Sequence, residues 1–515
     1  MGKHVKFYTN FYMRGDYVVI RGYDNGERFE DRIKYKPTLY VPSKKEKIIR
    51  FNHKCLERTI TGKPIEPIQF DSIKESRDFK DNYDKIDGFQ IFGSNLYDYV
   101  CVHQNYSNNY DPDHIRIINI DIEVGSADGF PEPKFANQEV TAITCSLNGI
   151  YYTFGVGEYN VKSPNVNYFN CENEEDLLKK FLLQWKKFDA DIITGWNVQG
   201  FDLPYLYNRI PKILPKKYLK MLSPSGIIKE REYMAYNREQ FEVVLVGTTI
   251  LDYLELYKKF TYSQQESYRL DHIAHVELGE NKLDYSEVET LHQLYKLDFD
   301  KFIDYNIKDV ELVDRLENKM KLIDMALAIA YDAKVCYRDV FTQVRMWDVL
   351  IHNWLYDRNI AIPPKKANFK GEQFAGAYVK NPQVGAHDWV MSFDLNSLYP
   401  HLIMQYNISP DTFIENESVE ISVDDLLFGR NPQIRNDVCM AGNGALFDRK
   451  KRGFLPEMMN KMYNDRVIAK QKMLEAEELL EQVNRRLNGE YSTLGNIANS
   501  RMGGETVEIE LNDLK

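Results

Sequence analysis

The 515-residue sequence lacks the features that mark membrane, secreted and metal-finger proteins. It has no stretch of about 18 consecutive apolar residues, which argues against a membrane-spanning helix. Its first residues, MGKHVKFYTNFYMRGDY, contain no apolar segment typical of a signal peptide. The six cysteines lie far apart without a C-x-x-C pair, which argues against a disulfide framework or a zinc site. We therefore expect a cytoplasmic protein with no membrane contact.

Positive charge is not in excess either. The net charge is −11, which argues mildly against a surface coated for nucleic-acid binding. Clustered metal-binding carboxylates and local basic patches remain compatible with DNA as a partner. The length exceeds what one core usually supports, so we expect three or more domains.

The apolar patterning predicts a mixed α/β fold. Residues 5–42 consist of short β-rich segments separated by turns and predict a small β-containing domain. The DPDH segment at 111–114 is a plausible boundary. An α/β unit with a mixed sheet then follows over 115–330, with expected strands at 115–125, 140–149, 150–157 and 190–197 and an expected helix at 174–188.

The second half predicts further elements in a different order. We expect a long hairpin over 230–247, a helix-rich region over 318–360, a Pro/Gly-containing connector and a strand at 389–395. One charged helix should run from Pro456 to about Asn488. The remaining residues are polar and weakly patterned.

Four carboxylates and a tyrosine occur in contexts that suit metal chemistry. Asp121 and Glu123 lie two apart on an expected strand, so both project from one face. Asp202 follows a Gly-Phe step at an expected strand-to-helix transition. Tyr305 and Asp309 lie four apart on an expected helix and therefore share a face.

Such carboxylates could converge on two divalent ions roughly 3.5–4 Å apart, as phosphodiester hydrolysis requires. The tyrosine could orient or deprotonate the attacking water. Each member alone has a plainer explanation. An Asp-x-Glu pair is usually a solvated strand face, Tyr305 alone would be half-buried packing, and Asp309 alone a surface charge. The order and contexts of the whole set favour a nuclease site.

The segments NIDIEVG, TGWNVQGFDLPYL and FIDYNIKDVELV resemble the three exonuclease motifs of DEDDy-type 3′→5′ exonucleases. The surrounding sequence, including LDYLELYKKF and SYRLDHIAH, resembles family B DNA polymerases of T-even-type bacteriophages. The resemblance implies a ribonuclease-H-like fold in which Tyr305 positions the water and Asn197 and Phe201 contact the terminal nucleotides. It implies two Mg²⁺ or Mn²⁺ ions bound by four residues, Asp121, Glu123, Asp202 and Asp309. The 230–247 hairpin would help to separate a frayed primer strand.

DLNSLYP at 394–400 resembles motif A of the same family. The match implies that Asp394 and the Leu395 carbonyl hold metal and that Ser397 and Leu398 cradle the triphosphate. Tyr399 would exclude a 2′-hydroxyl. His401 stands where the family commonly has serine, beyond the catalytic residues. FAGAYV resembles the connector that touches template DNA, with Gly376 at its centre, although taken alone it is better explained as an ordinary turn before a strand.

Arg466 and Lys470 lie four apart on the expected C-terminal helix and present two cations to one side. In isolation such a pair is a solvated basic face. The resemblance to the first helix of the polymerase fingers favours triphosphate binding. The nearby RKKRG segment at 449–453 could contact phosphates or simply solubilise a turn.

The rest of the polymerase pattern is missing. NGEYSTLGN imitates the end of motif B, but Ser492 replaces a glycine and Asn484 falls where the motif has lysine. No D-T-D-S stretch supplies the second pair of catalytic carboxylates. The resemblance covers residues 1 to about 485. It implies an N-terminal domain at 1–110 completed by about 340–383, an exonuclease domain at 111–339, a partial palm at 384–455, the start of the fingers at 456–488, and a divergent tail at 489–515.

We therefore expect the N-terminal part of a family B DNA polymerase with a complete proofreading exonuclease. A second polypeptide carrying motifs B and C and the thumb would complete the polymerase. A truncated, non-polymerising nucleic-acid-binding fragment and a stand-alone DEDDy exonuclease are the alternatives. The expected partners are primer–template DNA, single-stranded 3′ ends, dNTPs and this second chain. A sliding clamp and a single-strand-binding protein are further expected contacts, in the host cytoplasm if a phage encodes the chain.

Overall fold

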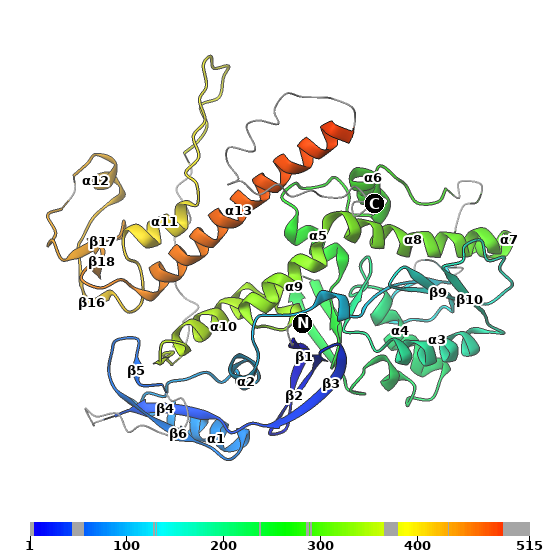
Figure 1. The fold of residues 1–515 in the computed structure, drawn as a ribbon, viewed down its shortest axis with the longest axis horizontal. Helices are drawn as coiled ribbons and strands as arrows, with labels where there is room; N and C mark the ends of the chain where they lie inside the picture. Colours follow the sequence, from blue (N-terminus) through cyan, green and yellow to red (C-terminus); the bar gives the residue numbers. More distant parts are fainter. Residues whose placement is uncertain are drawn as a thin grey trace. The chain divides into compact units, whose positions relative to one another are not determined.

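The computed structural model describes residues 5–43, 56–126, 129, 131–235, 238–284, 288, 291–364, 380–430 and 432–487 (Figure 1). Backbone contacts divide the chain into two compact units, Met1–Ala367 and Asn368–Lys515, and each is described by itself. Among the described residues, no helix is both long and apolar enough to cross a bilayer.

The first unit begins with the predicted β-rich region. Strands β1 (Lys6–Arg14), β2 (Tyr17–Asp24) and β3 (Glu27–Lys34) form an antiparallel meander. Two strand pairs follow. In the second pair, a strand that comes after α10 (Gln343–Tyr356) in the sequence lies beside a strand of the N-terminal region. These pairs are β4 (Thr38–Pro42) with β6 (Ile65–Gln69) and β5 (Arg58–Thr59) with β15 (Ile360–Ala361). Helices α1 (Ile73–Tyr83) and α2 (Tyr97–Asn105) lie between these strands in the sequence.

A six-stranded mixed sheet forms the centre of the first unit, as the patterning predicts. Its order is β10-β9-β8-β7-β11-β14. The β7–β8 and β8–β9 pairs are antiparallel, whereas β9–β10, β7–β11 and β11–β14 are parallel. The strands are β7 (Ile117–Val124), β8 (Val140–Leu147), β9 (Ile150–Gly155), β10 (Val166–Asn170), β11 (Ile192–Thr194) and β14 (Thr249–Ile250).

Helices cover this sheet because each has one apolar face. Helix α3 (Glu174–Phe188) begins at Asn173, whose side chain accepts from the Asp176 N–H, and carries acids in its first turn. Its buried residues, such as Phe181 and Trp185, join those of α4 (Asp202–Ile213) in one core with the sheet. Helix α8 (Phe299–Met320) packs on β7 and β8.

The remaining elements of the first unit complete its helical part. The predicted hairpin is present as β12 (Ile228–Ala235) and β13 (Arg238–Leu245). The predicted helix-rich region is also confirmed. The other elements are 3₁₀ turns η1 (Pro112–His114), η2 (Leu219–Leu222) and η3 (Tyr337–Phe341), and helices α5 (Tyr253–Phe260), α6 (Leu270–Leu278), α7 (Leu291–Leu297), α9 (Leu322–Ala333) and α10 (Gln343–Tyr356).

Asp191, at the start of β11, joins the N-terminal meander to the central sheet. It is 1% exposed, and its carboxylate accepts from Thr9 Oγ1 at 2.6 Å and Tyr23 OH at 2.9 Å. Arg28 donates to both carboxylate oxygens, at 2.8 and 2.9 Å, and the Arg116 N–H donates at 3.0 Å. Three strands of the meander and the central sheet thus share one buried charge, which is fully hydrogen-bonded.

The second unit contains a short helix, a small sheet and one long helix. Helix α11 (Leu398–Gln405) packs on α13 (Phe454–Leu487). The extent of α13 confirms the predicted long charged helix. The small sheet has the order β16-β18-β17. Its strands are β16 (Phe413–Ser418), β17 (Val438–Met440) and β18 (Ala445–Asp448), with α12 (Val423–Leu427) between the first two.

The strand predicted at 389–395 is wrong. These residues are exposed and irregular, and no described strand pairs with them. A strand needs a neighbour to satisfy its backbone N–H and C=O groups, so apolar patterning alone does not make one. Gly376 and the 489–515 tail, with Ser492, lie outside the described residues.

Replacing Asp191 with asparagine should destabilise the first unit. The substitution keeps the shape but removes one of the two carboxylate charges that pair with the half-buried Arg28. We expect a loss of about 3 kcal/mol in the free energy of unfolding, measured by urea denaturation of the full chain. Asp31→Asn, which breaks the exposed Lys6–Asp31 ion pair, is the control and should cost less than about 1 kcal/mol. Equal effects of the two substitutions would contradict this role.

Candidate metal site on the central sheet

Strand β7 separates an apolar face from a polar face by simple alternation. Ile118, Ile120 and Ile122 are buried in the core that contains α3 and α4. Asn119, Asp121 and Glu123 project to the opposite face, because successive side chains of a strand point in opposite directions. Helix α8 covers this polar face. The carboxylates therefore come to lie between the sheet and a helix.

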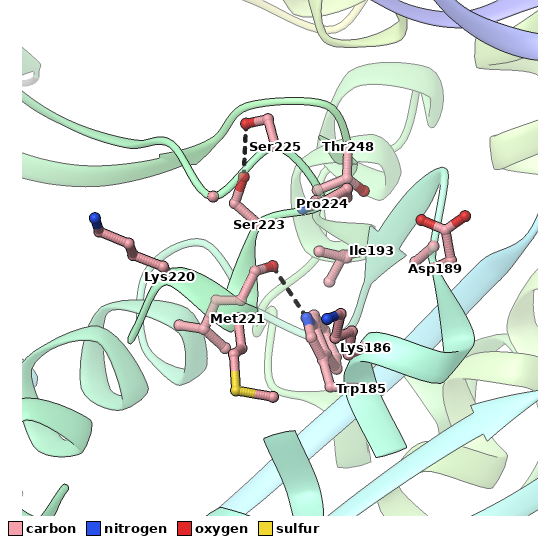
Figure 2. A pocket seen from close by; sticks show the side chains of 13 residues that line it. Trp185, Lys186, Asp189, Ile193, Lys220, Met221, Ser223, Pro224, Ser225 and Thr248 are labelled. Carbon is pink, nitrogen blue, oxygen red and sulfur yellow. Dashed lines mark hydrogen bonds between the residues drawn. The ribbon is translucent and has the colours of Figure 1, made fainter. Parts of the chain in front are cut away.

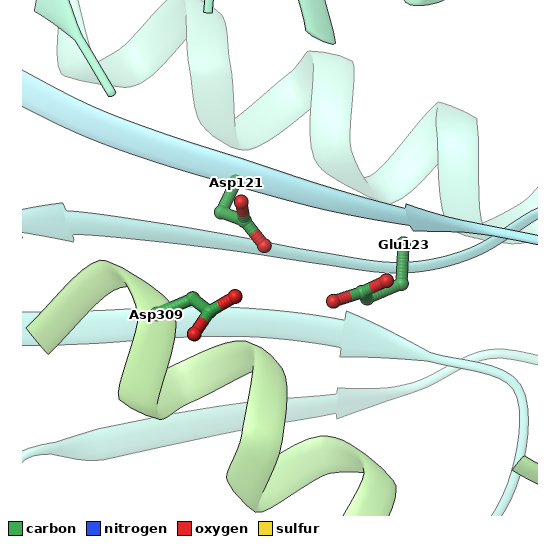
Figure 3. A group of neighbouring side chains, drawn as sticks. All are labelled: Asp121, Glu123 and Asp309. Carbon is green, nitrogen blue, oxygen red and sulfur yellow. The ribbon is translucent and has the colours of Figure 1, made fainter. Parts of the chain in front are cut away.

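Three of the predicted carboxylates meet there. Asp121, Glu123 and Asp309 each offer an oxygen, and these oxygens all lie within 4.8 Å of one another. Figure 3 shows the two acids of β7 and the acid of α8 directed toward a common space. The expected convergence of strand and helix is thus found for these three residues.

Asn306, on the same helix, holds Asp121 in place. Its Nδ2 donates to Asp121 Oδ2 at 2.6 Å, and its Oδ1 accepts from Thr144 Oγ1 at 2.5 Å. Asn306 is fully buried. Because its amide is fixed from both sides, the Asp121 carboxylate has one preferred orientation.

Asp202 lies beside this cluster and is anchored to the strand backbone. Its Oδ1 accepts from the Ile122 N–H at 3.0 Å. The pairing of β7 with β11 ends at Asn119, so Asp202 takes a backbone donor that the neighbouring strand does not use. Asp202 is not among the three oxygens that lie within 4.8 Å of one another.

Lys282 is a cation within the carboxylate site. Its ammonium forms an ion pair with Asp309 and donates to Tyr305 OH at 3.1 Å. Tyr305 and Asp309 share one face of α8, as their spacing predicts. The ammonium also lies 5.1 Å from the centre of the Tyr305 ring.

Crowding of like charges in a buried space shifts these groups toward their neutral forms. Burial, together with Asp309, raises the pKa of Glu123 to about 8. Burial raises the pKa of Asp202 to about 7, although its backbone hydrogen bonds oppose the shift. The pKa of Asp121 is also raised by burial and by Glu123. Burial and Asp309 raise the pKa of Tyr305 too, so its phenol keeps its proton at neutral pH.

The loop between β11 and α4 carries the two residues expected to contact nucleotides. Asn197 is exposed and has a left-handed backbone with φ of 63°. Phe201 is half-buried, stacks on Tyr205 and directly precedes Asp202. Asp252 fixes this loop by accepting from the N–H groups of Asn197 and Gln199 at 3.2 and 2.9 Å.

The donor set fits a hard divalent cation. Three carboxylates supply oxygen ligands, which Mg²⁺ and Mn²⁺ prefer. Asp309 Oδ1 is buried and has no hydrogen-bond partner in the described structure, so it is available to a ligand. The excess negative charge of the buried acids attracts positive charge. This attraction holds the Lys282 ammonium and would also favour a bound cation.

The predicted polymerase residues occupy the second unit. Asp394, Leu395 and Tyr399 are exposed, and Ser397 precedes α11 with a left-handed backbone, φ 54°. Leu398 is the first residue of that helix. Arg466 and Lys470 are both exposed on α13, one turn apart, as predicted. Their assignment to a nucleotide site stays a prediction.

Three residues of the carboxylate site escaped sequence reasoning: Lys282, Asn306 and Asp252. Asn306 lies three residues before Asp309 on one helix, and that spacing could have revealed it. Lys282 and Asp252 precede the helix by many residues. No local pattern links them to the acids, because the fold brings them together.

Comparison with known proteins identifies the family. A model of the DNA polymerase family B exonuclease domain matches residues 48–273, and a model of DNA polymerase family B matches residues 337–507. The chain belongs to DNA polymerase family B. The first match includes Asp121, Glu123 and Asp202, and the second includes the motif A segment and α13.

Individual relatives agree with this membership. A DNA-directed DNA polymerase of Enterobacteria phage T4 is 31% identical over 506 residues, covering 92% of this chain and 54% of the relative. That of Escherichia phage RB69 is 32% identical over 504 residues, with the same two shares. A DNA polymerase delta catalytic subunit of Dictyostelium discoideum is 26% identical over 389 residues, covering 71% of this chain and 34% of that subunit. The chain spans about half the length of the phage polymerases.

Lys282 should compete with a divalent cation for Asp309. Lys282→Met keeps the length of the side chain and removes its charge, so we expect Mn²⁺ affinity to rise by roughly tenfold, about 1.4 kcal/mol. Isothermal titration calorimetry measures the change.

Lys308→Met is the matched control, since Lys308 neighbours Asp309 in sequence but pairs with Glu280 and Glu311. It should leave the affinity nearly unchanged. An unchanged or weaker affinity in Lys282→Met would contradict the competition.

Proposed function

We propose that the first unit is a metal-dependent 3′→5′ exonuclease that removes nucleotides from DNA ends. The observation that carries the proposal is the cluster of Asp121, Glu123 and Asp309, with Tyr305 one turn from Asp309. A purely structural role does not explain three acids gathered in a space that raises their pKa values. Such sites are costly and are usually retained for chemistry.

Mg²⁺ or Mn²⁺ would be held by Asp121, Glu123 and Asp309, with Asp202 beside them. When bound, the ions supply an activated water and neutralise charge on the phosphate. Tyr305 keeps its phenolic proton, so it orients the water by hydrogen bonding rather than removing a proton. Lys282, released from Asp309, has its ammonium free for a phosphate oxygen.

Asn197 and Phe201 would hold the terminal nucleotides. Both lie on the loop that leads into Asp202, which couples substrate placement to the acids. Phe201 offers a ring on which a base can stack, and stacking does not depend on base identity. Such contacts suit an enzyme that must accept any 3′ end.

Replacing both Asp121 and Glu123 with alanine should abolish the nuclease. We expect at least a thousandfold loss in the rate at which a labelled single-stranded oligonucleotide is shortened with Mg²⁺, because two ligands are removed. Asp300→Ala is the control: this acid lies on the same helix as Asp309, accepts hydrogen bonds from Asn160, and its loss should leave activity unchanged. Retained activity in the double variant would sink the site assignment.

We also propose that the second unit contributes motif A and triphosphate-binding residues to DNA synthesis. Asp394 and the Leu395 carbonyl would bind metal, Ser397 and Leu398 the triphosphate, and Tyr399 the sugar. Arg466 and Lys470 would contact the phosphates, and Gly376 the template. The matched family and the one-turn spacing of the two cations support this role.

The remaining catalytic parts would come from a second polypeptide with motifs B and C and the thumb. The exposed surface beside motif A supports a missing neighbour: Trp389 is 99% exposed and Phe393 86%. Contiguous exposed apolar side chains usually mark an interaction surface. A truncated, non-polymerising fragment remains the alternative, and the following experiment separates the two.

Mixing this chain with a polypeptide carrying the remaining motifs from the same genome should give primer extension. In that complex, Arg466→Ala should weaken dNTP binding by roughly tenfold, because a charge-assisted contact is lost. Lys472→Ala is the control, since Lys472 lies two residues past Lys470 on the opposite side of α13. No association, or no extension, would contradict the two-chain proposal.

A further inference from the structure

A hollow of about 510 Å³ lies in the first unit, beside the end of α3 and the turn η2. Figure 2 shows Trp185 and Lys186 on one side, Ser223 and Ser225 on another, and Lys220 on a third. Ile193 contributes from β11, and Met221 contributes from η2. None of these residues belongs to the carboxylate site.

The polar groups inside the hollow are already committed. Ser223 and Ser225 both donate to the Val246 carbonyl, at 2.7 and 2.8 Å, and Thr248 donates to the Asp191 carbonyl at 3.1 Å. The indole of Trp185 donates to the Leu222 carbonyl at 3.0 Å. With these donors engaged, the hollow can offer a ligand mainly apolar contact, from the half-buried Met221 and the exposed Pro224.

The rim is basic, in a chain whose net charge is −11. Two exposed lysines line the hollow, Lys186 near the end of α3 and Lys220 in η2. The ion pairs on α3 join Lys179 to Glu175 and Lys180 to Asp176. Within the described part of the chain, no ion pair reaches Lys186 or Lys220.

The negative charge at the hollow is balanced by arginines, not by these lysines. Asp189 pairs with Arg21 at 2.5 Å and with Arg28 at 2.8 Å. The lysines therefore keep their charge for a ligand. The carboxyl end of α3 also lies here, since the helix ends at Asp189 with a left-handed φ of 46°. A helix carboxyl end carries partial negative charge, so an anionic ligand group would be attracted by the lysines and not by this end of α3.

These features suit an acidic peptide better than a phosphate ligand. Phosphate sites commonly combine lysines with helix amino ends or arginine forks, whereas this hollow has the carboxyl end of a helix, and its neighbouring arginines, Arg21 and Arg28, are paired with Asp189. A base would need directed donors and acceptors, and those inside the hollow are engaged. We propose that this hollow binds a segment of a partner protein in which a bulky apolar side chain is flanked by aspartates or glutamates.

Binding at this hollow should leave the nuclease accessible. The hollow borders Ile193 of β11, which pairs with Ile118 of β7, whereas Asp121 and Glu123 lie further toward the carboxyl end of β7. A partner held here would be attached to the enzyme while the carboxylate site works. The surface therefore suits recruitment rather than inhibition.

Fluorescence anisotropy of the full chain tests the proposal with a short labelled peptide of aspartate and glutamate around one phenylalanine. We expect binding that weakens with salt and that falls roughly tenfold in Lys186→Glu/Lys220→Glu. Lys74→Glu/Lys85→Glu makes the same change of charge at a distant surface and should bind like the original chain. Both double variants should keep nuclease activity, which shows that they fold.

The apolar half of the proposal is tested separately. Replacing the phenylalanine of the peptide with alanine should weaken binding by roughly tenfold, and Met221→Ala should weaken the original peptide severalfold. No peptide binding, or equal binding by both double variants, would overturn the proposal. So would a deoxynucleotide oligomer or a nucleoside monophosphate that binds with the same lysine dependence while the peptide does not.

Discussion

The first unit depends on the buried carboxylate of Asp191, which links the N-terminal meander to the central sheet. Its carboxylate receives donors from all three strands of the N-terminal meander, and its backbone begins β11. Strand β11 aligns β7, and the loop that follows β11 leads into Asp202. Placement of the clustered acids thus depends on a hydrogen-bonded charge that touches none of them. Burying such a charge is favourable only when every partner is present, which makes the arrangement all-or-none.

The carboxylate site has the opposite electrostatic character. Asp191 is compensated, whereas Asp121, Glu123 and Asp309 face one another with Lys282 as the nearby cation. The surrounding fold stabilises this repulsive arrangement through Asn306 and through protonation, which burial favours. The stable hydrogen bonds around Asp191 therefore help the fold to tolerate the repulsion among the three clustered acids. A cation that relieves this repulsion is expected to bind between them.

Much of this architecture was predictable because local chemistry and fold agree. The alternation around Asp121, the cap at Asn173 and the Tyr305–Asp309 spacing each determine one element or one face. What local pattern could not supply is contact between distant segments. Lys282 reaches Asp309 across 27 residues of sequence, and Asp252 reaches the Asn197 loop across 55. The strand expected around Asp394 failed for a related reason, since pairing depends on a neighbour that local sequence cannot specify.

Asp202 also has a structural role, because β11 ends before it could pair with Ile122 of β7. By accepting the Ile122 N–H, its side chain continues the sheet by one hydrogen bond beyond the last paired residue. The same carboxylate is thus part of the scaffold and part of the proposed metal site. Loss of activity in an Asp202 variant would therefore mix a missing ligand with a loosened strand, and loss in an Asp309 variant would mix a missing ligand with a released Lys282.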